Sequence, residues 1–176
     1  MSPISLPALH ASHAGTWLTG AGGTVRALSK GEALPVDIRG EVIYYVGPTP
    51  AKPGHIIGSA GPTTAERMDP FTVPLLDAGL RGAIGKGGRS PQIATAFREH
   101  NAVYFIAVGG AGALLSHQIT SVEVVAYEDL GTEAMRRMTL NRFPVIVCNG
   151  VHGGDGVLGV RVEVEPEPLA VLAVAG

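Results

Sequence analysis

Short apolar runs that end at glycine or proline recur along this chain, and the clearest of them is Ala102 to Val108. The run contains no charged residue and leads directly into Gly109 and Gly110, which predicts a strand buried on both faces. A strand of that kind belongs to a sheet that is covered on both sides, usually by helices. Because helical patterns alternate with such runs here, the sequence predicts an α/β fold.

Other strands are predicted for ranges rich in aliphatic and β-branched residues: 42–46, 55–60, 122–126, 143–148, 157–164 and 169–174, with a short apolar element at 82–85. Helices are predicted for ranges with apolar residues at helical spacing: 25–30, 71–79, 91–100 and 132–138, and for a turn of small residues into a helix at 109–115. We expect Gly20, Gly22 and Gly23 to interrupt any regular element near the N-terminus. No internal repeat or second domain boundary is visible, so we expect one domain over residues 1–176.

The composition argues against several classes of partner. Hydrophobic residues make up 45% of the chain and charged residues 16%, as in a folded globular protein. The net charge is −2 and the 13 basic residues are scattered, which argues against nucleic acid as a partner. No apolar run approaches the roughly 20 residues that a membrane-spanning helix needs, and the N-terminus lacks a secretory signal pattern. We therefore expect a cytoplasmic protein with no membrane partner.

The metal-ligating residue types do not form a recognisable metal site. Cys148 is the single cysteine, whereas an iron–sulfur cluster needs three or four thiolates. The six histidines show no two-histidine spacing on one helix. We therefore expect no metal to be bound by this chain alone. Cys148 follows an apolar run and is predicted to be a buried thiol at the end of a strand, with a reactive thiol as the alternative.

The stretch from Gly61 to Asp69 carries the most informative chemistry. Glycine and proline fix the backbone path, Thr63 and Thr64 follow, and Arg67 comes four residues after Thr63. Such a turn can present hydroxyls and backbone N–H groups to an anion while the guanidinium binds a carboxylate. The alternative is a helix start in which threonine is the N-cap and an acidic residue lies in the first turn.

A second candidate site, Gly85 to Ser90, places Lys86 in a glycine-lined bend before a helix that begins at Ser90-Pro91. Serine is expected to cap that helix, and its N-terminus is a favourable place for an anion. The alternative is a solvated surface turn. Gly109 to Gly112 lacks the spacing of a dinucleotide-binding turn, and we interpret it as close helix–strand packing. For Glu128 and Asp129 we favour helix capping and ion pairing over a role in a site.

Six segments occur in an order and spacing that together resemble one known family: IYYVGPTPAKPG (43–54), IGSAGPTTAERMD (57–69), GAIGKGG (82–88), AVYFIAVGGAGALL (102–115), VEVVAYEDLGTEAMRRM (122–138) and FPVIV (143–147). On these segments the chain resembles the beta subunit of the iron–sulfur class I fumarase and L(+)-tartrate dehydratase family, or the C-terminal domain where the two parts are fused. The resemblance covers residues 31–148 and leaves 1–30 and 150–176 as divergent segments.

The resemblance implies a swivelling β/β/α domain and reversible hydration or dehydration of a small dicarboxylate such as fumarate, malate or tartrate. It implies an oligomer with an alpha-type subunit, which holds a [4Fe–4S] cluster through its own cysteines while this chain binds none. It also implies Thr63 as the catalytic, proton-abstracting residue and Thr64, Arg67 and Lys86 as substrate-binding residues. Threonine is a weak base, so its alkoxide would need such nearby cations.

One part of the family pattern is missing. Family members carry an Arg-Asp-x-x-His sequence, with an arginine that contributes to carboxylate binding, where this chain reads Leu18 to Val25 without arginine or histidine. Two functions therefore stay open. The first is a hydro-lyase subunit that requires an alpha-type partner. The second is a stand-alone, repurposed descendant, either an enzyme or a carboxylate-binding module, without a cluster partner.

Overall fold

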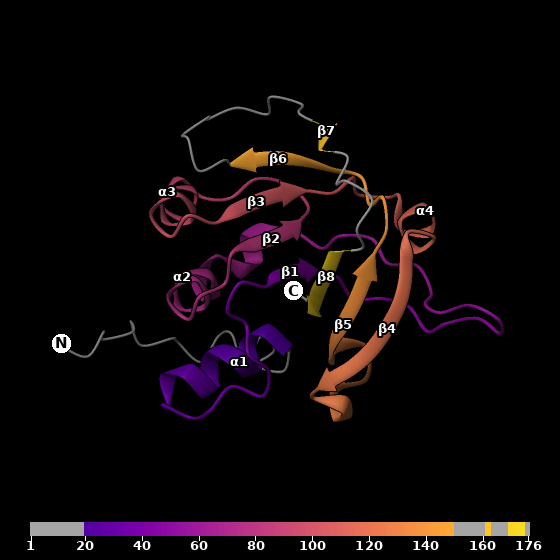
Figure 1. The fold of residues 1–176 in the computed structure, drawn as a ribbon, viewed down its shortest axis with the longest axis horizontal. Helices are drawn as coiled ribbons and strands as arrows, with labels where there is room; N and C mark the ends of the chain where they lie inside the picture. The colour runs from indigo at the N-terminus through magenta and orange to yellow at the C-terminus, as the bar shows by residue number, and fades with distance from the viewer. Residues whose placement is uncertain (1–19, 150–160, 163–168, 175–176) are drawn as a thin grey trace.

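Eight strands form one mixed sheet in the computed structural model, which describes residues 20–149, 161–162 and 169–174 (Figure 1). In chain order they are β1 (Val42–Tyr45), β2 (Gly82–Gly85), β3 (Val103–Ile106), β4 (Ile119–Ala126), β5 (Met135–Leu140), β6 (Val145–Asn149), β7 (Arg161–Val162) and β8 (Leu169–Val174). Across the sheet the order is β4-β5-β8-β1-β2-β3-β6-β7. The last strand therefore lies beside the first, in the middle of the sheet.

The four central strands are parallel, and each strand outside them is antiparallel to its inner neighbour. β1 pairs in parallel with both β8 and β2, and β2 pairs in parallel with β3. On one side β5 joins β8 and β4 joins β5, and on the other β6 joins β3 and β7 joins β6, all antiparallel. The carboxyl ends of β1, β2 and β3 thus lie side by side along one edge of the sheet, the edge formed by strand ends, which is where open α/β sheets usually bind ligands.

The helices are short and cover both faces of the sheet (Figure 1). They are α1 (Gly20–Ser29), α2 (Asp69–Asp77), α3 (Pro91–Glu99) and α4 (Gly112–Ser116), with two 3₁₀ helices, η2 (Ala65–Met68) and η3 (Glu128–Glu133). Residues of α2 and α3 pack on one face, and α1 contributes Leu28 to the edge of that cluster. Leu115 of α4 packs on the other face. The predicted α/β class is confirmed.

Successive side chains of the central strands point to opposite faces of the sheet, and each face carries its own hydrophobic core. On β1, Ile43 and Tyr45 belong to the first core, which contains residues of α2 and α3, while Tyr44 and the next residue after the strand, Val46, belong to the second core. On β8, Leu172 belongs to the first core and its neighbours Val171 and Ala173 to the second. Successive side chains of a strand point to opposite faces, so strands buried on both faces are continuously apolar. β3 meets this expectation only in part, because Tyr104 is fully buried but Val103, Phe105 and Ile106 are half-buried.

The prediction of a helix at 132–138 is wrong. The range spans the end of η3 and most of β5, which pairs with β4 and β8. Met135 packs in the first core and Met138 in the second. A separation of three places two side chains on one side of a helix but on opposite faces of a strand. The same spacing therefore fitted a strand that is buried on both faces.

The predicted strand at 55–60 is also wrong, since this segment is a loop that folds back on Thr49. The Ser59 N–H donates to Thr49 Oγ1 at 2.8 Å, and the Thr49 N–H donates to the Ser59 carbonyl at 3.0 Å. The buried Tyr44 hydroxyl donates to the Ala60 carbonyl at 2.7 Å. Ile57 and Ala60 nevertheless lie in the second core, which explains the apolar character of the segment.

Near the N-terminus, α1 begins at Gly20, so the glycines there do not interrupt the helix as predicted. A Cβ at Gly23 would lie 2.9 Å from the ring of Tyr127, so the glycine leaves room for that ring. The strand predicted at 157–164 is described only at Arg161–Val162, where β7 lies; its other residues are outside the described part of the chain. Strands or helices confirm the remaining predicted ranges within a few residues.

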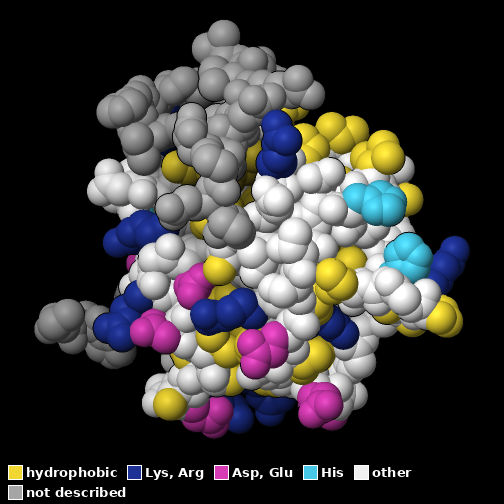
Figure 2. Space-filling model, turned by 45° about the vertical axis from the view of Figure 1, so that its right-hand side comes forward, with side chains coloured by type: hydrophobic (Ala, Val, Ile, Leu, Met, Phe, Trp, Pro, Cys, Tyr) yellow, Lys and Arg dark blue, Asp and Glu magenta, His cyan; other side chains and the backbone are white. Residues whose placement is uncertain are grey.

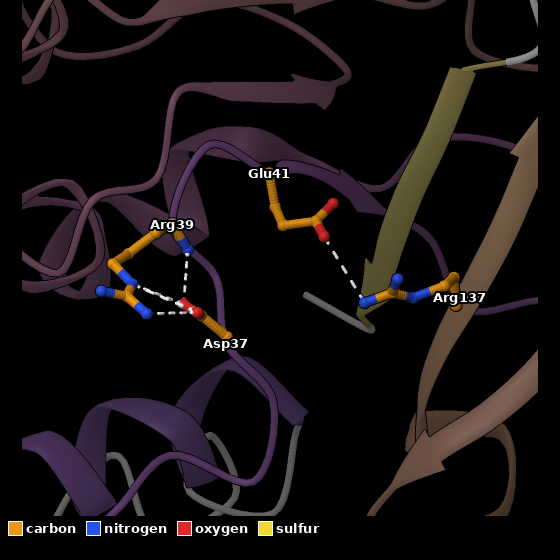
Figure 3. A network of polar contacts seen from close by, with 4 residues as sticks. All are labelled: Asp37, Arg39, Glu41 and Arg137. Carbon is orange, nitrogen blue, oxygen red and sulfur yellow. Dashed lines mark hydrogen bonds and ion pairs between the residues drawn. The ribbon is translucent and has the colours of Figure 1, made fainter.

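Polar contacts at the amino end of β1 differ from those at its carboxyl end. Asp37 and Arg39 form an exposed ion pair at 2.6 Å, which lowers the pKa of Asp37 to about 2 (Figure 3). Glu41 reaches across to Arg137 on β5 at 3.4 Å. These contacts tie the chain before β1 to itself and to the antiparallel part of the sheet, away from the strand ends that carry the predicted site.

The surface shows no concentration of one charge on the face seen in Figure 2. Basic and acidic side chains are interspersed there, and hydrophobic side chains gather along its upper right margin. Within the described residues, none of the helices combines the length and the apolar character that crossing a bilayer requires.

Candidate active site

Thr63 lies between the carboxyl ends of β1 and β2. Its N–H donates to the Tyr45 carbonyl at 2.8 Å, and its own carbonyl accepts from the Lys86 N–H at 2.9 Å. Thr64 and Lys86 then form an isolated parallel bridge, and the Ala65 N–H donates to the Lys86 carbonyl at 3.0 Å. The two sequence segments that were predicted separately as anion-binding turns are therefore joined through their backbones.

The hydroxyl of Thr63 is buried and unpaired. Its Oγ1 atom has no hydrogen-bond partner among the described residues, although the residue as a whole is half-buried. A buried polar atom without a partner costs free energy, so such an atom calls for an explanation. Thr63 stands at the strand ends where open α/β sheets usually bind ligands, which makes it a candidate site residue.

The two segments that meet at Thr63 also carry two exposed cations. Arg67 lies on η2, four residues further along, and Lys86 directly follows β2. Neither forms an ion pair with any described residue. A Cβ at Gly109, which follows β3, would lie 2.7 Å from Cδ of Lys86, so the lysine stem crosses the end of the third parallel strand. The structure thus brings Thr63, Thr64, Arg67 and Lys86 to one edge of the sheet.

Helix capping does not account for these residues. Thr64 precedes η2 without a capping hydrogen bond from its side chain, and the same holds for Ser90 before α3. The predicted serine cap is therefore wrong. Instead the Asp69 carboxylate accepts the Ser90 N–H at 3.0 Å, so a side chain from α2 occupies the N-terminus of α3. An outside anion at that helix end, which the sequence suggested, would have to displace Asp69.

Arg89 is a central residue here that the sequence did not single out as buried. Its side chain is 0% exposed, whereas that of Lys86, three residues earlier, is exposed. Its Nε donates to Asp69 Oδ1 at 2.6 Å, and its Nη2 donates to Thr72 Oγ1. Burial by itself lowers the pKa of this guanidinium, but Tyr45 and Asp69 raise it above its ordinary value.

Three aromatic rings enclose the Arg89 guanidinium. The ring centroids of Tyr45, Phe97 and Tyr104 lie 5.6, 5.5 and 5.3 Å from its Cζ atom. The Tyr104 hydroxyl donates to the Gly87 carbonyl at 2.7 Å, and burial raises the pKa of Tyr104. The same group of side chains therefore holds the arginine and the loop that leads to it, but leaves the arginine no route to a ligand at the surface.

The residues of this chain do not fit an iron–sulfur cluster. Cys148 lies partly buried on β6, and burial raises the pKa of its thiol, whereas a cluster ligand is a thiolate. It is also the single cysteine of the sequence. In the part of the chain that the structure describes, no three His, Cys, Asp or Glu side chains gather to hold a metal ion.

A separate groove of about 390 Å³ lies between the proline-rich loop after β1 and the antiparallel edge of the sheet. One wall contains Pro48 and Ile57, and the other contains Val122, Thr132 and Arg136. None of the four candidate residues lines it. The groove and the candidate site are therefore separate places on the chain.

Comparison with known proteins shows the family of this chain. A family model described as "Fumarase C-terminus" matches residues 21–156. The chain belongs to the fumarase C-terminus family. Both segments that meet at Thr63 and Lys86 lie inside the matched range, as do all strands up to β6.

Relatives of this fumarase C-terminus chain come from bacteria, a protozoan and an archaeon. The aerobic class I fumarate hydratase of Escherichia coli is 37% identical over 130 residues, covering 73% of this chain and 24% of that enzyme. Fumarate hydratase 2 of Leishmania major is 35% identical over 131 residues, covering 73% and 23%. A Methanocaldococcus jannaschii protein assigned as L(+)-tartrate dehydratase subunit beta is 32% identical over 137 residues, covering 74% and 70%. The chain thus spans about a quarter of the fumarate hydratases.

Proposed function

We propose that this chain is the beta-type subunit of a hydro-lyase that adds water to, or removes it from, a small dicarboxylate. The observation that carries the proposal is the pairing of Thr63 and Ala65 with Lys86, which joins the segment that carries Thr63 and Arg67 to the segment that begins at Lys86. The relatives are named as fumarate hydratases and as a tartrate dehydratase subunit, and both names denote this class of reaction.

The chemistry assigns a role to each residue. Removal of water from a dicarboxylate requires a group that accepts a carbon-bound proton and cations that hold the carboxylates. Thr63 is proposed as the proton acceptor, since its hydroxyl is unpaired, and the positive charges of Arg67 and Lys86 favour its alkoxide. The same two cations bind the carboxylates, and Thr64 contributes to binding from the neighbouring position.

The proposed partner is an alpha-type subunit that closes over this edge. Three large hydrophobic side chains are exposed in the loop after β1, after β3 and on α4: Ile56 at 56%, Val108 at 56% and Leu114 at 72%. Their loops are adjacent, because the Ala60 N–H donates to the Gly112 carbonyl at 3.1 Å. Exposed apolar patches mark interaction surfaces. The iron–sulfur cluster of the family is proposed to lie on that partner, since this chain lacks the ligands, and when bound it supplies a Lewis acid for the leaving hydroxyl.

The same proposal covers the domain. A single sheet that runs from β1 to β8, with α2 and α3 packed on one face, supports one unit over residues 1–176, and we propose the swivelling β/β/α type for it. The competing function, a stand-alone carboxylate-binding protein, is favoured by one observation. The family's Arg-Asp-x-x-His sequence has no counterpart at residues 18–25, which removes one expected carboxylate ligand.

Co-expression tests the proposal. This chain is produced anaerobically with an alpha-type subunit, and hydration of fumarate and mesaconate and dehydration of tartrate are assayed. We expect co-purification, iron in the complex and turnover of one of these substrates, with turnover reduced at least about 10²-fold in Arg67→Ala. Arg39→Ala, at the opposite end of β1, is the control. A chain that takes up no partner and binds a dicarboxylate alone would support the stand-alone function instead.

A further inference from the structure

The loops that carry Arg67 and Lys86 are joined a second time, behind the surface, by a buried ion pair. Asp69 comes two residues after Arg67, and Arg89 comes three residues after Lys86. We propose that Asp69 and Arg89 are positioning residues that set the separation between the two substrate-binding cations. The inference rests on the proposed function, and it adds two residues that do not touch the substrate.

The segment that carries Arg67 and the segment that begins at Lys86 are connected to each other at two points. Arg67 lies between these points, and Lys86 lies at the first of them. The first connection is the backbone pairing of Thr63 and Ala65 with Lys86. The second is the Asp69 carboxylate, which accepts from Arg89 Nε through one oxygen and from the Ser90 N–H through the other. η2, with Arg67, is thus held at its start and just after its end. The loop that begins at Lys86 is held at both ends as well.

The surroundings of Arg89 make the second connection rigid. Its guanidinium is 0% exposed and is enclosed by the rings of Tyr45, Phe97 and Tyr104. Its planar fork binds Asp69 with one nitrogen and Thr72 with another. A lysine could supply the charge, but it could neither bond Asp69 Oδ1 and Thr72 Oγ1 together in this geometry nor stack on the rings.

Fixed separation matters because a dicarboxylate bound at both ends requires two cations at a set distance. A misplacement of about 1 Å can cost on the order of 10²-fold in rate. Arg89 itself cannot supply either contact, since it is fully buried behind the loop. Its influence on the substrate therefore passes through Arg67 and Lys86.

Four variants of the co-expressed complex separate positioning from stability. Asp69→Asn and Arg89→Lys break the connection while leaving side chains of similar size. The double variant Asp69→Leu with Arg89→Met replaces the buried ion pair by apolar side chains, which often restores stability. Val171→Ala, on β8 in the second core, is the control that lowers stability away from the site.

We expect both single variants to raise KM for the dicarboxylate by at least about tenfold. The double variant is expected to recover most of the melting temperature and to keep the raised KM. Val171→Ala is expected to lower the melting temperature and to leave KM within about twofold, because it lies outside the network. If KM in the double variant returns to the wild-type value, or if Val171→Ala raises KM equally, the pair only stabilises the fold and the proposal is wrong.

A second readout uses no substrate, so it decides the inference even if the wild-type complex shows no turnover. Hydrogen exchange of the isolated chain reports the backbone N–H groups of Ala65, Lys86 and Ser90, which form the two connections. Asp69→Asn is expected to speed exchange at all three by about tenfold or more relative to β3. Acceleration at Ser90 alone, with Lys86 and Ala65 unchanged, would contradict the positioning role.

Discussion

At the scale of single side chains, the buried Asp69–Arg89 ion pair is the contact whose loss we expect to destabilise the fold most. Both groups are charged and largely buried, with Arg89 0% and Asp69 15% exposed. Removing one partner of such a pair leaves an uncompensated charge in the interior, which typically costs about 3–5 kcal/mol. The pair therefore has consequences for folding that can be measured apart from any activity.

We predict that Asp69→Asn lowers the free energy of unfolding by about 3–5 kcal/mol, whereas the apolar double variant with Arg89→Met lies within about 2 kcal/mol of the wild type. Urea denaturation followed by circular dichroism measures both. Asp37→Asn is the matched control, because the Asp37–Arg39 pair is exposed and its loss is expected to leave the transition unchanged. Equal losses in Asp69→Asn and Asp37→Asn would contradict the account.

A second prediction concerns His100, which follows α3. Its ring bonds the Ala96 carbonyl at 2.8 Å and Asp77 at 2.9 Å, and these contacts, with Glu99 nearby, raise its pKa above 6.5. A raised pKa in the folded state stabilises the protein below the ordinary pKa, and the gain is lost as pH rises through the raised value. The melting temperature of His100→Gln should therefore fall less with increasing pH than that of the wild type. A melting temperature of His100→Gln that falls with pH as steeply as that of the wild type would contradict this prediction.

Arg89 also shows where residue-level prediction from sequence ends. The candidate residues Thr63, Thr64, Arg67 and Lys86 were marked by glycine-bounded turns and by family resemblance, and the structure places them together. An arginine between glycines and Ser-Pro has the appearance of a surface residue. Its burial depends on rings from β1, α3 and β3, which no local pattern reveals.

At the scale of elements, the loop at 55–61 and α4 approach through two glycines. A Cβ at Gly112 would lie 2.5 Å from Ser59 Oγ and 2.8 Å from the nitrogen of Gly61. This close packing agrees with the prediction of helix–strand crowding for the glycines after β3, although the partner is a loop. The contact carries the exposed side chains of Ile56 and Leu114 to the proposed docking edge.

We therefore predict that Gly112→Ala lowers the free energy of unfolding by about 1–3 kcal/mol, because the added methyl group has no space. It should also weaken co-purification of the alpha-type subunit, since the edge is displaced. Gly47→Ala is the control, because nothing lies within 4 Å of a Cβ there. Denaturation and pull-down of both variants test this, and equal behaviour of the two would contradict it.

The elements that the sequence misassigned share a physical cause. Residues 132–138 and 55–60 were judged by local spacing and composition, but their conformations follow from tertiary partners. β5 is a strand because β4 and β8 pair with it on both sides. The segment 55–60 is a loop because Thr49 supplies the hydrogen bonds that a neighbouring strand would otherwise supply.

At the scale of the whole molecule, β8 joins two parts of the open sheet. β8 pairs with β1 in parallel and with β5 in the antiparallel direction, so it joins the central strands to the β4–β5 pair. Val171, Leu172 and Val174 are buried in the two cores. This order, in which β8 lies at the centre of the sheet, follows from long-range pairing that apolar runs alone do not specify.

We predict that deletion of residues 169–176 abolishes cooperative unfolding, because β5 and β1 lose the strand between them. Differential scanning calorimetry measures this. Val171→Ala, which keeps the strand, should retain a single transition at a lower temperature. A truncated chain that still unfolds in one sharp transition would mean that β1 and β5 pair directly.

The central claim, that Thr63 handles the proton, is tested most directly by Thr63→Val in the complex with the alpha-type subunit. Valine keeps the shape and removes a buried hydroxyl that has no partner among the described residues. We predict an unchanged or higher melting temperature together with a fall in turnover of about 10²–10⁴-fold, and measurable activity in Thr63→Ser. Turnover in Thr63→Val within about tenfold of the wild type would contradict the account, because the proton would then be handled elsewhere.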